Sequence, residues 1–147
     1  MNIIKEVKRL TEKHQSRDPF IIAKGENIAI EFSDYEETKG YFLKIVNKKV
    51  IVINQNLEEL MILFAVAHEL GHAILHHNKH DILKYDKGIY FMQDDDLFNT
   101  NSIQEHQANI FAVELLKYTL DGIVIPRDLE NYLLKYRHFF YSTLKFN

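Results

Sequence analysis

The chain has 147 residues, of which 46% are hydrophobic and 27% are charged, and it contains only five glycines and two prolines. This composition predicts a single globular domain over residues 1–147 and excludes a disordered or linker-rich chain. The net charge of −3 argues against direct binding to nucleic acid, and the absence of cysteine excludes disulfide bonds and thiolate metal ligands. No apolar run approaches the ~20 residues of a membrane span, so we expect a cytoplasmic protein without a membrane partner. Its oligomeric state stays open.

The N-terminal region predicts two helices. Apolar residues recur at helical spacing from Ile3 to Leu10, which favours a first helix ending near residues 14–17. Asp18 followed by Pro19 is a typical helix start, and Gly25 is a plausible stop. The second helix is therefore expected to be about two turns long.

The next region predicts a small sheet. Residues 27–32 alternate apolar and polar side chains, and residues 39–46 and 50–54 are rich in β-branched and aromatic types. Residues 47–49 suit the turn of a hairpin between the last two segments. We expect these three strands to form a three-stranded antiparallel sheet.

A long apolar helix is predicted over residues 57–77, with Asn56 as its N-cap and Glu59 completing a capping box. Apolar residues cover most of its circumference, so we expect it at the centre of the fold. The helical pattern is absent from residues 78–101, which favour a long loop that could contain a short strand or helix. Ser102 is then expected to cap a helix that runs to about Tyr118. Residues 129–137 favour another helix, and residues 138–141 a last helical piece.

The sequence His68-Glu69-Leu70-Gly71-His72 lies inside the long apolar helix. Residues four apart on a helix share one face, so the imidazoles of His68 and His72 can bind one cation while Glu69 faces the same site. As ordinary core residues, these side chains would be buried polar groups without evident partners, which is costly. The motif therefore predicts a zinc hydrolase, with His68 and His72 as ligands and Glu69 as catalytic base.

A catalytic zinc ion usually has three protein ligands, so a third must lie elsewhere. Asn78 occupies the position that a third histidine of the metzincin type would need, and His76 lies too far along the helix from His68. Glu105 is the favoured ligand, because Asn109 follows one turn later and could hydrogen-bond a ligating histidine. The alternative for Glu105 is a role as a helix-capping residue only, and Glu114 is the weaker candidate for the third ligand. The other polar residues are expected in solvent: Asp94, Asp95 and Asp96 in a loop, and His76, His77 and His80 at the end of the helix.

The segments from His68 to His76 and from Glu105 to Ala112 resemble the two motifs of the ImmA/IrrE family of gluzincin-type metallopeptidases. Residues 38–54 also resemble the sheet that precedes the zinc helix in that family. The resemblance covers residues 18–117 and implies an α+β, mostly helical zincin-like fold with a central zinc-binding helix. It further implies zinc held by His68, His72 and Glu105, Glu69 as base, and a protein substrate that is often a helix-turn-helix repressor of a phage or mobile element.

The expected chemistry follows from these parts. Zinc would lower the pKa of a bound water toward ~7, and Glu69 would accept its proton and pass it to the leaving amine. Substrate is expected to add as a strand to the free edge of the sheet. The favoured function is thus a zinc-dependent endopeptidase, and the alternative is a zinc-containing regulatory protein that acts by binding a partner. Candidates for a second oxyanion donor are Tyr35, Tyr41, Tyr90 and His106.

Overall fold

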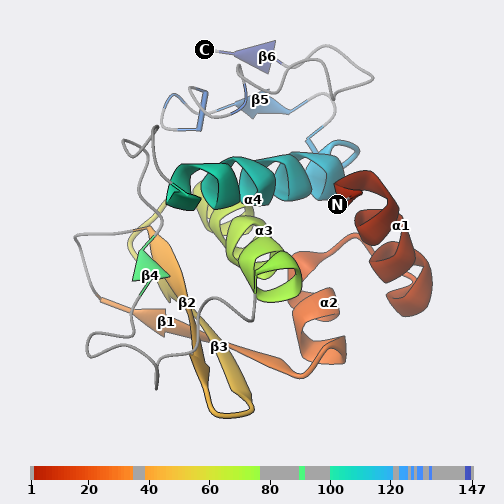
Figure 1. Cartoon of the computed structure of the whole chain (residues 1–147). Coiled ribbons are helices and arrows are strands. Elements are labelled where there is room, and N and C mark those ends of the chain that lie inside the picture. The colour runs from red at the N-terminus through yellow and green to blue at the C-terminus, as the bar shows by residue number, and fades with distance from the viewer. Residues whose placement is uncertain are drawn as a thin grey trace.

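The computed structural model describes residues 2–34, 39–76, 90–91, 100–120, 123–125, 127, 129–130, 133 and 145–146, with only the backbone of 90–91, 100–102 and 145–146. These residues form an α+β fold, in which a central helix lies between a small sheet and a second long helix (Figure 1). Within the described part, no helix is both long and apolar enough to cross a bilayer.

Helices α1 (Ile3–His14) and α2 (Pro19–Gly25) confirm the two predicted N-terminal helices. The side chain of Asp18 caps α2 by accepting a hydrogen bond from the Phe20 N–H at 2.9 Å, and Pro19 fills the first turn, where its missing N–H costs nothing. The chain turns after α2 at Asn27, whose φ of 61° lies in the left-handed region. This turn directs the chain into the sheet.

The sheet contains β1 (Ile28–Ser33), β2 (Gly40–Ile45), β3 (Lys48–Asn54) and β4 (Tyr90–Phe91) in the order β1-β3-β2-β4. β2 and β3 form the predicted antiparallel hairpin, but β1 runs parallel to β3. The expectation of a three-stranded antiparallel sheet is therefore wrong: the sheet is mixed and has a short fourth strand. The physical reason is that residues 50–53 of β3 are all buried, so the most apolar strand takes the interior position and leaves β1 and β2 on opposite sides of it.

The central helix α3 (Glu59–Leu75) packs against β2 and β3 on one side and against α4 (Thr100–Leu116) on the other (Figure 1). Its residues from Phe64 to Ala73 are all buried, as the apolar pattern predicts. The predicted capping box is wrong, because Glu58 occupies the N-cap without a side-chain bond and the amide of Asn56 donates instead to Asp34 at 2.8 Å.

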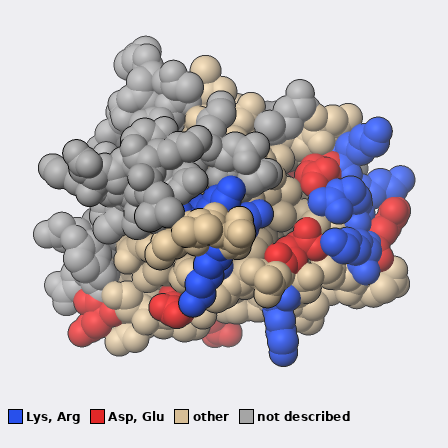
Figure 2. Space-filling view, turned by 60° about the horizontal axis from the view of Figure 1, so that its bottom comes forward, with Lys and Arg blue, Asp and Glu red and all other residues tan. Residues whose placement is uncertain are grey.

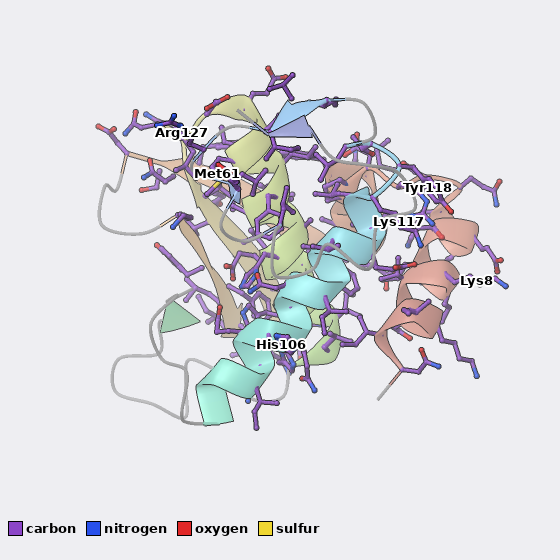
Figure 3. The ribbon with its side chains drawn as sticks, turned by 90° about the horizontal axis from the view of Figure 1, so that it is seen from above. Lys8, Met61, His106, Lys117, Tyr118 and Arg127 are labelled. Carbon is purple, nitrogen blue, oxygen red and sulfur yellow. The ribbon has the colours of Figure 1, made fainter. Side chains whose placement is uncertain are left out.

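Helix α4 begins at Thr100, so Ser102 lies inside the helix and the predicted cap is wrong. At its other end, Arg17 donates to the carbonyls of Glu114 and Leu115 at 2.9 and 3.1 Å and lies over the Tyr118 ring. These bonds satisfy carbonyls that have no partner within the helix. Figure 3 shows Tyr118 at this end of α4, beside α1.

The C-terminal region adds a two-stranded parallel sheet of β5 (Val124–Ile125) and β6 (Lys145–Phe146), which the sequence pattern does not predict. Leu129, Glu130 and Leu133 are helical, in agreement with the helix expected over residues 129–137. The helical piece expected over residues 138–141 lies outside the described residues.

Helices α3 and α4 approach each other closely at Gly71. A Cβ placed on Gly71 would lie 3.1 Å from the Phe111 Cβ and 3.2 Å from the Ala108 Cα. Glycine in mid-helix costs about 1 kcal/mol, and this close approach of a neighbouring helix is its structural explanation. The small side chains of Ala108 and Ala112 lie buried on the same stretch of α4.

We expect Gly71→Ala to lower the free energy of unfolding by about 1–3 kcal/mol, because the backbone at Ala108 cannot yield to the added methyl group. Urea denaturation followed by circular dichroism measures this change. Lys8→Ala, on the exposed face of α1, is the control and should change stability by less than about 0.5 kcal/mol. A gain in stability, as helix propensity alone predicts, would contradict the close contact.

Candidate metal centre

Three buried side chains from the two long helices meet at one point. His68 and His72 project from α3, and their Nε2 atoms lie 3.0 and 2.9 Å from the two carboxylate oxygens of Glu105 on α4. One ligand atom from each residue lies within 4.8 Å of the others, so this cluster could hold a metal ion. Within the part of the chain that the structure describes, no other group of three or more such residues has this geometry.

The local structure explains why these residues converge. The two histidines are four residues apart on α3, so their rings lie on one face with centroids 4.9 Å apart and planes at 75°. Glu105 reaches them because Gly71, which lies between the two histidines in sequence, lets α4 approach the backbone of α3 closely. The site is thus built on two rigid helices rather than on loops.

Asn109 fixes the orientation of His68, as its position one turn after Glu105 predicts. Its side-chain oxygen lies 2.6 Å from His68 Nδ1 and can only accept a hydrogen bond, so Nδ1 carries the proton. The Nε2 atom of the neutral ring then presents its lone pair to the cluster. This is the tautomer that binds a cation through Nε2.

A second hydrogen-bonded chain, which the sequence pattern does not predict, orients His72. Gln107 accepts from His76 Nε2 at 2.7 Å, and His76 Nδ1 lies 3.0 Å from His72 Nδ1. Since the proton of neutral His76 is on Nε2, its Nδ1 accepts from His72, which leaves the lone pair of His72 on Nε2. The prediction that His76 lies at the solvated end of the helix is wrong, because its side chain is only 3% exposed. His77 and His80 lie outside the described residues.

We expect His76→Ala to weaken zinc binding by about 10- to 100-fold, because His72 loses the acceptor that sets its tautomer. Competition with a chromophoric chelator measures this affinity. The control is His106→Ala, since His106 lies on the exposed side of α4 (Figure 3). Equal zinc affinities for the two variants would contradict the positioning role of His76.

Glu69 lies beside the cluster in an apolar setting. The side chain is 1% exposed, and neither of its carboxylate oxygens has a hydrogen-bond partner among the described residues. Burial raises the pKa of Glu69 well above its usual range, and the negative charge of Glu105 raises it further. A cation held by the cluster would offset both effects, so this carboxylate suits a site that contains one.

Glu105 behaves in the opposite way. Burial raises its pKa, but when both histidine rings are protonated, hydrogen bonds from their Nε2–H groups and their positive charge outweigh burial and lower the pKa to about 2. A bound cation would replace these Nε2 protons and leave each ring in the neutral form with its proton on Nδ1. Glu105 therefore stays ionised at neutral pH. An ionised carboxylate between two imidazoles is a donor set that zinc accepts.

The other candidates from the sequence that the structure describes do not join this cluster. Glu114 forms a buried ion pair with Lys117 at 2.7 Å, and His106 is exposed. Tyr41 is half-buried in β2, where it pairs with Val52. Tyr35, the three aspartates at 94–96 and the side chain of Tyr90 lie outside the described part.

Comparison with known proteins agrees with this geometry. A peptidase family model, described as the IrrE N-terminal-like domain, matches residues 23–117, which contain β1 to α4 and the whole cluster. The chain belongs to this family. It is also 33% identical to "Uncharacterized immunity region protein 2" of Bacillus phage phi105 over 132 residues, a match that covers 81% of this chain and 78% of the phage protein. The resemblance to the ImmA/IrrE family is thereby confirmed.

Proposed function

We propose that this chain is a zinc-dependent endopeptidase, in which His68, His72 and Glu105 bind the metal and Glu69 is the catalytic base. The observation that carries the proposal is the buried Glu69 carboxylate, which has no hydrogen-bond partner among the described residues and lies next to three convergent metal-binding side chains. A site that only stabilises the fold needs no base beside its ligands. Membership of a peptidase family supports the same conclusion.

The donor set fits zinc rather than a harder cation. Two imidazole nitrogens and one carboxylate are the ligands of many catalytic zinc sites, whereas calcium and magnesium favour all-oxygen coordination. Three protein ligands leave one position of a tetrahedral ion to water. The hydrogen bonds of Asn109 and His76 to the two histidines add the outer support that such sites commonly have.

Bound zinc would supply a water of lowered pKa and a positive charge that polarises the scissile carbonyl. Glu69 accepts the proton of the attacking water and transfers it to the leaving amine. Its position next to the sheet suits this role, because a Cβ on Gly40 of β2 would lie only 3.7 Å from the Glu69 Cγ. The sheet and the proposed base therefore border the same space.

For the substrate, we favour a protein in the cytoplasm, specifically a helix-turn-helix repressor of a phage or mobile element. The supporting observation is the 33% identity to a protein of a phage immunity region. The test is to incubate the zinc-loaded chain with the repressor encoded beside its gene and to identify fragments by mass spectrometry. Specific fragments that disappear on adding a chelator support the proposal, whereas an intact repressor and a chain that binds no zinc would overturn it.

A further inference from the structure

A groove lies at the end of the sheet away from Glu69. It has a volume of about 860 Å³ and is bordered by α2, the start of β1 and the β2–β3 turn. Gly40, next to Glu69, and Ile45, in the groove, are the two ends of β2, so the groove lies about 16 Å along the strand from the proposed base. Its apolar lining includes Phe20, Ile28, Ile30, Ile45 and Val46.

Lysines surround this apolar lining. Lys24, Lys48 and Lys49 line the groove, and Lys44 lies directly across the hairpin from Lys49. Within the described residues, none of these four lysines forms an ion pair, and the nearby Glu26 is engaged by Lys13 and His14 at 2.7 Å. Burial lowers the pKa of Lys49 and the charge of Lys44 lowers it further, whereas the charge of Glu26 raises it by a smaller amount. Figure 2 turns this end of the molecule toward the viewer and shows Lys and Arg side chains among uncharged residues and some Asp and Glu side chains.

The turn at the rim of the groove is strained. Val46 has a φ of 55°, a region that favours glycine or asparagine and that a β-branched residue rarely adopts. Its side chain is nevertheless 57% exposed, and the adjacent Ile45 is 41% exposed. Strained backbone that holds an apolar side chain in solvent is a feature of contact sites.

We propose that this groove binds a protein segment that carries both acidic and apolar side chains. These lysines, which form no ion pair within the described part of the chain, favour carboxylates, and the apolar lining favours a segment that also brings aliphatic or aromatic side chains. Nucleic acid fits less well, because the lining has more apolar side chains than cations and contains no arginine. The proposal goes beyond the peptidase function and does not depend on the metal centre.

Panning of a phage-displayed library of random 12-residue peptides on the purified full chain tests this proposal. We expect the enriched peptides to combine net negative charge with apolar residues, and to bind more weakly as the salt concentration rises. The double variant Lys48→Glu, Lys49→Glu should bind them at least 10-fold more weakly. The matched control reverses Lys5 and Lys8 on the exposed face of α1, where Figure 3 shows Lys8, and should bind them as the unmodified chain does.

A second variant separates a loss of peptide binding from a loss of the fold. Val46→Gly suits the positive φ at this turn position, so it should keep the fold while weakening peptide binding at least threefold through the lost apolar contact. The absence of enriched peptides, enrichment of neutral or basic ones, or equal binding by the groove variants would overturn the proposal. Two further results would also overturn it by assigning another occupant: lysine-dependent binding of a 20-base-pair DNA duplex, or lysine-dependent dimerisation in sedimentation equilibrium.

Discussion

Glu69→Gln is expected to lower the rate of substrate cleavage by about 10²- to 10⁴-fold while the chain still binds zinc. The amide has the same shape as the carboxylate but cannot accept a proton from water at neutral pH. The three proposed ligands are untouched, so the metal content should not change. Cleavage is measured by mass spectrometry of the substrate fragments, and zinc by elemental analysis of the purified protein.

Glu31→Gln, on the exposed side of β1, is the matched control and should cleave as the unmodified chain does. If Glu69→Gln retained full activity, the endopeptidase mechanism would be wrong. Zinc-loaded Glu69→Gln that still controls its partner in cells would favour the alternative, a regulatory protein that acts by binding.

Glu105→Gln is expected to weaken zinc binding by more than about 100-fold, a larger loss than removal of an outer hydrogen bond causes. The variant keeps the volume of the side chain, and its amide can accept a hydrogen bond from one histidine and donate one to the neutral ring of the other, so the contact between α3 and α4 should persist. Loss of the negative charge is the change that matters, because it removes the anionic ligand. Zinc affinity is measured by competition with a chelator, and the fold by circular dichroism.

Glu114→Gln is the matched control for this experiment, because Glu114 lies on the same helix and pairs with Lys117 rather than with the cluster. It should bind zinc with unchanged affinity. The reverse result, zinc lost from Glu114→Gln and kept by Glu105→Gln, would contradict the ligand assignment.

Much of the fold could be predicted from local patterns in the sequence. The Asp18 cap, the β2–β3 hairpin and the buried helix around His68 each depend on neighbouring residues, and the structure confirms them. The structure also brings together His68, His72 and Glu105, because helical spacing places the first two and the small residues of α4 allow the approach of the third.

The errors arose where a distant residue competes with a local signal. The position of Asn56 just before the long apolar helix predicts an N-cap, but its side chain donates a hydrogen bond to Asp34 at the end of the sheet. The position of His76 at the end of α3 predicts a solvated side chain, but the side chain is buried and donates a hydrogen bond to Gln107 of α4. The direction of β1 likewise depends on which strand is central, which no local pattern reveals. Each error therefore reflects a tertiary contact that sequence spacing does not contain.

The Glu69 carboxylate, which has no hydrogen-bond partner among the described residues, has a consequence for the evolution of the fold. A buried charge without a partner, or a buried carboxyl group kept neutral, opposes folding, whereas an apolar side chain of similar size would favour it. Selection for stability alone would therefore remove glutamate from this position. If Glu69 is the proposed catalytic base, its presence in the buried stretch of α3 places reactivity and stability in conflict at this position.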